Sequence, residues 1–263
     1  MLHSRRVETT NDRVLITGAS TGIGYELAKL FAADGWHLVL VARNEARLQQ
    51  VAAELRAAHR IDVKVLAKDL AVPTALAEIF EALRDTPITA LVNNAGFGWQ
   101  GPFARGEIKV SLDMMRVNMD ALVQLTHLFV QPMLARGAGR ILNVASTAAF
   151  QPGPFTDIYY ASKAFVYSFS VALAEELAGT GVTVTTLCPG ATRTEFHDRA
   201  GMQRSLRWLP LMEADEVARI GYRGLMRGKR IVIPGTMNRI AAALSKCLPA
   251  RFTAKMVRGI NDC

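Results

Sequence analysis

Short apolar and β-branched runs alternate with longer segments of helical period from residue 13 onward. These runs predict β-strands because they are brief and rich in Val, Leu, Ile and Thr. The predicted strands cover residues 13–17, 36–42, 63–67, 90–93, 140–145, 182–187 and 230–233. The segments between them, such as residues 25–33 and 46–55, carry good helix formers. Strands that alternate with helices in this way are typical of repeated βα units and a parallel sheet.

The pattern therefore predicts an α/β fold with a Rossmann-like, doubly wound parallel sheet of about seven strands and helices on both faces. A chain of 263 residues, 50% of them hydrophobic, can bury one sizeable core. We expect residues 13–235 to form the catalytic domain, residues 1–12 an N-terminal extension and residues 236–263 a C-terminal extension. In such sheets a ligand binds beyond the carboxyl ends of the strands, where the strand order reverses.

The formal net charge of +8 raises the question of nucleic-acid binding. Lys and Arg are spread over many segments without a basic stripe of interleaved aromatic residues, so no nucleic-acid partner is expected. The three cysteines, Cys188, Cys247 and Cys263, show no CxxC spacing and predict neither a disulfide framework nor a metal site. No apolar run resembles a signal peptide or is long enough to span a bilayer, so a cytoplasmic location is expected.

The charge balance changes in the C-terminal extension. Its basic residues, set against the single acid Asp262, are Arg239, Lys246, Arg251, Lys255 and Arg258. Apolar residues alternate with them: Ile240, Ala243, Leu244, Leu248, Phe252, Met256 and Val257. A basic amphipathic segment of this kind makes peripheral contact with an anionic membrane surface, or docks on its own domain or a partner subunit, and the sequence leaves these alternatives open. Pro249 predicts two short helices rather than one.

A glycine-rich turn follows the first predicted strand and opens directly into a helix. Its residues after Thr17 are Gly18, Ala19, Ser20, Thr21, Gly22, Ile23 and Gly24. Glycine allows a tight turn and close approach to a pyrophosphate, and the helix N-terminus offers N–H groups and partial positive charge to it. The alternative is an ordinary glycine-rich βα turn. The strand–turn–helix context favours a dinucleotide site.

The TGxxxGxG spacing of this turn resembles that of the short-chain dehydrogenase/reductase family, and the resemblance extends along nearly the whole chain. Asn94, Ala95 and Gly96, preceded by Asn93, resemble the family's NNAG element. The resemblance further implies cofactor contacts for Asp69, at the adenine, and for Pro189, Gly190 and Thr194, near the nicotinamide amide. Taken singly, the asparagines could satisfy turn backbone and Asp69 could cap the helix near Pro73.

The end of the second predicted strand bears on the choice of dinucleotide. Ala42 stands where relatives that use NAD carry an acid, and Arg43 follows it. An arginine pairs with the 2′-phosphate of NADP, which a carboxylate would repel. Arg43 could instead be a solvated residue at the start of a helix. Thr21 slightly weakens the case for NADP, because many NADP-using relatives have a second basic residue at that position. We predict NADP(H).

Tyr159 and Lys163 lie four residues apart and so share one helix face. A nearby ammonium would favour the phenolate of a tyrosine acting as general acid/base. The resemblance implies that Lys163 also holds the nicotinamide ribose, that Ser146 binds the substrate oxygen and that Asn118 organises a water-linked proton path. By chance YxxxK could arise, Ser146 could end a strand and Asn118 could face solvent, but their joint occurrence in order favours a catalytic site.

The expected function is the NADP(H)-dependent interconversion of a hydrophobic carbonyl compound and its alcohol, with Tyr159 as general acid/base. The rival is a dinucleotide-binding sensor or scaffold protein on the same fold; no GxSxG elbow supports a hydrolase. Aromatic residues near the predicted site suggest an apolar substrate pocket: Phe97, Trp99, Phe150, Phe155 and Trp208. Some of these could instead lie in a subunit interface, since the family resemblance implies a homo-oligomer.

Overall fold

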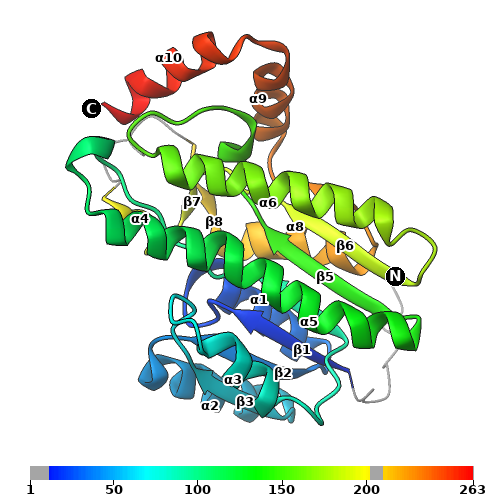
Figure 1. The fold of residues 1–263 in the computed structure, drawn as a ribbon. Coiled ribbons are helices and arrows are strands. Elements are labelled where there is room, and N and C mark those ends of the chain that lie inside the picture. Colours follow the sequence, from blue (N-terminus) through cyan, green and yellow to red (C-terminus); the bar gives the residue numbers. More distant parts are fainter. Residues whose placement is uncertain (1–11, 202–209, 263) are drawn as a thin grey trace.

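The parallel sheet lies at the centre of the computed structural model, which describes residues 12–201 and 210–262 (Figure 1). Its strands are β1 (Arg13–Thr17), β2 (His37–Ala42), β3 (Val63–Ala67), β4 (Ala90–Asn93), β5 (Gly139–Val144), β6 (Val182–Leu187) and β9 (Ile231–Val232). The strand order is β3-β2-β1-β4-β5-β6-β9, and every adjacent pair is parallel. This arrangement confirms the predicted fold class. The last strand is shorter than predicted because only Ile231 and Val232 pair with β6 at the sheet edge.

Helices cover both faces of the sheet (Figure 1). The helices are α1 (Gly22–Ala33), α2 (Glu45–His59), α3 (Ala75–Ala82), α4 (Ile108–Met115), α5 (Ala121–Arg136), α6 (Asp157–Glu176), α7 (Phe196–Ala200), α8 (Ala214–Met226), α9 (Thr236–Cys247) and α10 (Ala250–Asn261). One face packs on α1, α2 and α8, and the other on α3, α5 and α6. A small separate sheet of β7 (Thr192–Arg193) and β8 (Met212–Glu213), which the sequence pattern did not reveal, follows the β6 end.

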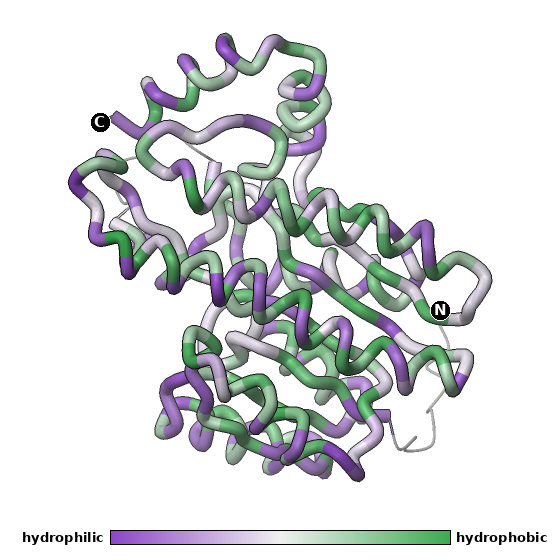
Figure 2. Tube along the Cα trace, in the orientation of Figure 1, coloured by the Kyte–Doolittle hydropathy of each residue, from purple (hydrophilic) through white to green (hydrophobic). Residues whose placement is uncertain are grey.

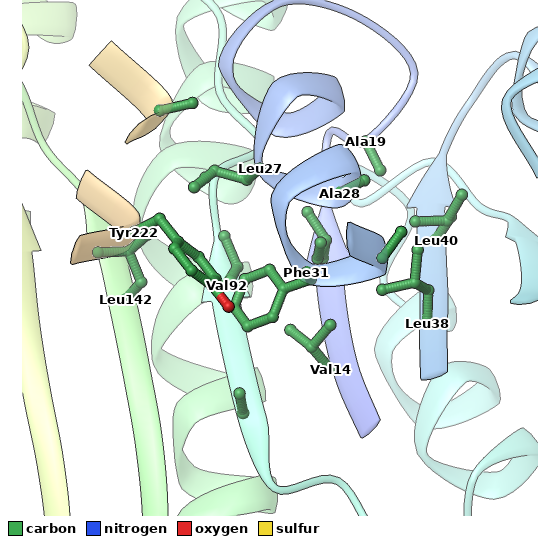
Figure 3. Close-up of a cluster of buried hydrophobic side chains, with 14 of the residues drawn as sticks. Val14, Ala19, Leu27, Ala28, Phe31, Leu38, Leu40, Val92, Leu142 and Tyr222 are labelled. Carbon is green, nitrogen blue, oxygen red and sulfur yellow. The ribbon is translucent and has the colours of Figure 1, made fainter. Parts of the chain in front are cut away.

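Alternation along the central strands builds the two halves of the core. Val14 and Ile16 of β1 point to the α1 side, and Leu15 points to the α5 side, because successive side chains of a strand face opposite ways. Figure 3 shows Phe31 of α1 beside Tyr222 of α8 within the first half. Their rings meet edge to face with centroids 4.9 Å apart, a favourable aromatic geometry that ties α8 to α1.

The strand order reverses between β1 and β4, since β2 and β3 lie on one side and β5 and β6 on the other. The segments that carry the predicted motifs follow the carboxyl ends of β1, β4, β5 and β6, so the fold gathers them at one edge. The C-terminal helices α9 and α10 lie at one end of the molecule and are separated at Leu248 and Pro249, as the proline predicted (Figure 1). In the described parts of the chain, no helix is both long and apolar enough to cross a membrane.

Candidate active site

A cavity of about 1190 Å³ opens at the carboxyl edge of the sheet. It exceeds the ~300–1,000 Å³ of ordinary ligand pockets, which leaves room for a dinucleotide together with a second molecule. The predicted cofactor residues that line it are Gly18, Ser20, Thr21, Gly22, Ile23, Arg43, Asp69, Asn94, Ala95, Gly96, Tyr159, Lys163, Pro189, Gly190 and Thr194. Gly24 lies beneath this lining rather than in it. The fold thus brings residues from distant parts of the chain to one cavity.

The glycine turn forms a cradle that side chains would fill. Gly18 and Gly22 adopt φ angles of +64° and +59°, in the left-handed region that favours glycine. A Cβ on Gly24 would overlap the carbonyl oxygen of Gly18, and one on Gly22 would lie 3.0 Å from the methyl group of Thr194. Because α1 begins at Gly22, its free N–H groups face this cradle. These features fit the pyrophosphate of a dinucleotide.

The NNAG element holds the glycine turn in place. Asn94 Nδ2 donates to the carbonyl oxygens of Thr17 and Gly18, at 3.0 and 3.1 Å. The backbone N–H groups of Asn94 and Ala95 both donate to Thr17 Oγ1 at 3.0 Å. Asn93 points into the core, where its Nδ2 donates to Asn143 Oδ1. Both asparagines therefore satisfy buried polar groups, and Asn94 does so while lining the cavity.

Positive charge gathers at the end of the cavity beside β2. Exposed Arg43 lines this end together with Arg47 and with Lys68, whose ammonium is paired with Glu78, and Ala42 leaves no carboxylate at the strand end. Arg47, one turn into α2, was not among the predicted site residues. Asp69 Oδ1 accepts a hydrogen bond from the Ala71 N–H at 3.0 Å, so this acid organises its own turn and also lines the cavity.

Tyr159 and Lys163 both point from α6 into the cavity, as their spacing predicts. Lys163 is 5% exposed; its Nζ donates to the Val144 carbonyl oxygen at 2.9 Å and lies 5.8 Å from the centroid of the Tyr159 ring. Burial lowers the pKa of Lys163 to about 8. Burial also raises the pKa of Tyr159, against a smaller lowering by its hydrogen bond to Ser146. Burial thus outweighs the lowering that a neighbouring ammonium was expected to produce.

Ser146 connects the catalytic helix to the segment after β6. It lies just beyond β5, where its Oγ accepts from the Ala148 N–H at 3.1 Å and donates to the Pro189 carbonyl oxygen at 3.4 Å. Its hydroxyl therefore has partners in Tyr159 and in the Pro189 carbonyl oxygen.

Asn118 lies in a π-helical turn, Arg116–Asp120, and is 1% exposed. Its Oδ1 accepts from the Phe97 N–H, and its Nδ2 donates to the Phe97 carbonyl oxygen and to Ser162 Oγ, each at 3.0 Å. A solvent-facing Asn118 is therefore excluded. Turns of this kind occur often at functional sites. Asn118 fixes the loop after the NNAG element against α6.

The C-terminal helices supply one wall of the cavity. The lining residues from this region are Asn238, Ala241, Ala242, Ser245, Val257, Ile260 and Asn261. Asn261 is 8% exposed, and its Nδ2 donates to the Pro154 carbonyl oxygen and to Thr156 Oγ1, at 2.9 and 3.0 Å. Its own carbonyl oxygen accepts from Gln100 Nε2 at 2.6 Å. Asn261 thereby ties the end of α10 to two loops beside Tyr159.

Residues 12–205 match the family described as short chain dehydrogenase. The chain belongs to the short chain dehydrogenase family. Its members couple a nicotinamide dinucleotide to alcohol and carbonyl chemistry, so this protein is a dinucleotide-binding oxidoreductase acting on CH–OH or C=O groups.

Three known proteins are similar to this dehydrogenase over most of its length. Sulfoacetaldehyde reductase 2 of Chromohalobacter salexigens is 37% identical over 221 residues, covering 80% of this chain and 86% of that protein. A short-chain dehydrogenase from Sphingobium yanoikuyae, solved in complex with NADPH, is 35% identical with a TM-score of 0.81, covering 90% and 96% of the two chains. The bulky-bulky ketone specific alcohol dehydrogenase from Comamonas testosteroni is 32% identical with a TM-score of 0.78, covering 89% and 91%.

The aromatic residues predicted for the substrate pocket of this dehydrogenase separate into three groups. Phe97 lines the cavity. Trp99, Phe150 and Phe155 are not among its lining residues, because each has packed elsewhere. Trp99 covers Gly101 and Gly106, Phe150 meets the ring of Tyr167 at 5.0 Å, and Phe155 lies under the guanidinium of Arg258. Trp208 lies outside the described residues.

Other side chains take the place of those aromatic residues in the dehydrogenase. Phe196 of α7 lines the cavity with its ring 5.4 Å from that of Tyr159, and His197 follows it. The sequence pattern did not reveal that the C-terminal helices form a wall of the cavity. The signal for this wall was a set of polar residues at intervals along these amphipathic helices: Asn238, Ser245 and Asn261. Asparagine is unfavourable within a helix unless its side chain has a partner.

Proposed function

We propose that this short chain dehydrogenase uses NADP(H) to interconvert bulky apolar ketones and their alcohols, with Tyr159 as the proton donor in reduction. The observation that carries the proposal is the meeting of Tyr159, Lys163 and Ser146 in one cavity, next to a glycine cradle that fits a dinucleotide. Bound there, the dinucleotide supplies the hydride that reduces the carbonyl carbon.

The protein's own groups act on the carbonyl oxygen. Ser146 and Tyr159 bind that oxygen and orient the carbonyl for attack. As the new C–H bond forms, the proton of Tyr159 moves to the oxygen and completes the alcohol. Tyr159 is protonated at neutral pH and so has a proton to give. Burial raises its pKa and makes it a weaker acid, so this role depends on groups that stabilise its phenolate. The ammonium of Lys163 stabilises the phenolate that remains. Oxidation of the alcohol follows the same path in reverse.

Backbone groups of the protein would hold the pyrophosphate at the centre of the cofactor, and basic side chains would hold its adenosine end. We assign the pyrophosphate to the cradle of Gly18, Gly22 and Gly24, and the 2′-phosphate to Arg43, with Arg47 as a second cation nearby. The NADPH bound by the relative from Sphingobium yanoikuyae supports this choice. A ratio of kcat/KM for NADPH over NADH near one would contradict it.

The substrate end favours a neutral, bulky molecule. Ala148, Phe196, Val257 and Ile260 present apolar surface there, and Arg199 is paired with Glu195 at 2.5 Å rather than free to bind an anion. The ketone named for the Comamonas testosteroni enzyme is bulky, whereas sulfoacetaldehyde, named for another relative, is small and anionic.

A panel of carbonyl compounds tests the proposal. NADPH consumption is followed spectroscopically with diaryl and alkyl-aryl ketones, short aldehydes and sulfoacetaldehyde. The expected order of kcat/KM places bulky ketones first and sulfoacetaldehyde last. The reverse order would refute the substrate class, and no turnover of any member would favour a binding protein without catalysis.

A further inference from the structure

A row of large apolar side chains lies exposed on the two C-terminal helices and the turn between them. We call it the tail ridge; it consists of Met237, Ile240, Leu244, Leu248, Phe252 and Met256. Their exposed fractions range from 39% for Leu248 to 69% for Met237. Single exposed apolar residues are ordinary on protein surfaces, but a set that recurs along two consecutive helices points to an interaction site.

The tail ridge is distinct from the face that packs on the protein. On α9, Met237, Ile240 and Leu244 follow one another at helical spacing, whereas Ala242 is 3% exposed and faces inward. On α10, Phe252 and Met256 lie one turn apart beside an inward stripe of buried residues. That stripe is Thr253, Val257 and Asn261. Each helix therefore has one side on the cavity wall and an exposed apolar strip on another side. Figure 2 shows hydrophilic and hydrophobic positions alternating along α9 and α10.

Positive charge borders the ridge. At 100° per residue, Arg251 and Lys255 lie beside Phe252 on the outer side of α10, whereas Arg239 lies about 100° round α9 from Ile240, away from the ridge. Among the described residues, no carboxylate forms an ion pair with any of these three. An apolar strip with cations along its edge matches a surface that is apolar inside and anionic at its boundary.

We infer that the tail ridge docks this dehydrogenase on the surface of an anionic lipid bilayer. Phe252 and Met256 enter the headgroup boundary, and Arg251 and Lys255 remain at the phosphate level. A second copy of the chain fits less well, because two ridges face to face would bring like charges together. The opposite side of the same helices lines the cavity, so docking places the substrate wall next to the lipid.

Vesicle sedimentation of the full-length chain tests this inference without any substrate. We expect the protein to pellet with vesicles of phosphatidylcholine and phosphatidylglycerol at low salt, to pellet at least tenfold less with phosphatidylcholine alone, and to be released by added salt. The double variant Leu244→Ser/Phe252→Ser and the charge reversal Arg251→Glu/Lys255→Glu should each reduce binding about tenfold. The matched control is Phe103→Ser/Ile108→Ser, whose side chains are 59% and 65% exposed away from the ridge; it should bind like the unmutated protein.

Circular dichroism and NADPH binding check that each variant is folded. Equal pelleting with both vesicle types, or pelleting that the ridge variants leave unchanged, would overturn the inference. The inference would also be overturned, in favour of self-association, if the unmutated chain does not bind vesicles and light scattering shows it as a dimer but the ridge variants as monomers. Since sedimentation needs no turnover, failure of the proposed function would leave this result intact.

Discussion

The two ends of the cavity are built in different ways. At the cofactor end, groups from adjacent strand ends hold one another, as the side-chain amide of Asn94 holds the carbonyl oxygens of Thr17 and Gly18. At the substrate end, side chains from the end of the chain reach loops far away in sequence, as Asn261 reaches Thr156. The first construction tolerates little change because glycine conformations and parallel pairing determine it. The second can vary without disturbing the sheet. We therefore expect substitutions at the substrate end to alter substrate choice while leaving the cofactor end intact.

The largest effect on turnover should follow substitution of Tyr159, where the cofactor end and the substrate end of the cavity meet. Replacing Tyr159 with Phe removes the proposed proton donor while leaving the ring packed on Phe196. We expect kcat for ketone reduction to fall by about 10²–10⁴-fold. The Kd for NADPH, measured by its fluorescence, should change less than about threefold. A variant that keeps its kcat would remove Tyr159 from the mechanism.

A methyl group in the glycine cradle should damage cofactor binding next. In the Gly24→Ala variant the new Cβ meets the Gly18 carbonyl oxygen and Asn94 Nδ2, so the turn must shift. Overpacking of this kind costs about 1–3 kcal/mol, which would weaken NADPH binding by roughly 5–150-fold. Titration calorimetry measures the change. The control is Gly259→Ala on α10, where a Cβ has no neighbour within 4 Å; equal losses in both variants would contradict the cradle.

Removing the charge of Arg43 should change the preference for NADPH over NADH more than it changes the rate with NADH. In Arg43→Ala, we expect the kcat/KM ratio of NADPH over NADH to fall by roughly tenfold or more, because a charge-assisted hydrogen bond contributes about 1.5–3 kcal/mol. Rates with NADH should stay nearly constant. Arg84→Ala serves as control, since Arg84 pairs with Glu81 on the surface outside the cavity. A fall with both cofactors alike would make Arg43 structural.

The substrate end can be loosened without touching the cofactor end. Asn261→Ala deletes the bonds to Pro154 and Thr156, so the wall beside Tyr160 loses its anchor. We expect KM for a bulky ketone to rise by about threefold to tenfold, with the Kd for NADPH unchanged. Lys255→Ala, on the outer side of the same helix, should leave both constants unaltered. A rise in the NADPH Kd as large as that in KM would show that the two ends are coupled.

The smallest effect concerns stability against pH. The pKa of Lys163 is about 8 in the folded protein, below its ordinary value of 10.5. Between these values the unfolded chain binds the additional proton, so this group makes the free energy of unfolding rise with pH, by at most about 1.4 kcal/mol per pH unit. Urea titrations of the protein with and without Lys163→Met from pH 8 to 10 should differ in slope accordingly. Both proteins carry Cys188→Ala, because burial raises the pKa of Cys188 to about 12, which opposes the effect of Lys163, and because Lys163 itself lowers that pKa. Parallel slopes would contradict the buried ammonium.

Much of the cofactor end could be predicted from sequence because its signals are local. The strand 13–17, the turn that follows it and the spacing of Tyr159 and Lys163 depend on periods and glycine positions within a short stretch. Their meeting in space then follows from the rule that parallel strands end at one edge. The direction of the Tyr159 pKa shift did not follow, since it depends on burial that spacing alone does not give.

The substrate end could not be predicted in the same way. Aromatic identity suggested Trp99, Phe150 and Phe155, but each packs against another partner: Trp99 against glycines of its own loop, Phe150 against the ring of Tyr167, and Phe155 under the guanidinium of Arg258. The wall formed by Asn261 depends on how two helices fold back onto the cavity, which is a long-range event. Pro249 indicated where those helices separate and not where they pack.

The most direct test of the central claim follows the hydride and the proton together. The protein is given NADPH deuterated at the transferring position, with a bulky aryl ketone in a single turnover, and the product alcohol is examined by mass spectrometry. We predict one deuterium on the carbinol carbon for the unmutated protein, and a rate at least about 10²-fold lower for Tyr159→Phe. Cofactor oxidation without deuterium in the alcohol, or equal rates for the two proteins, would contradict the account.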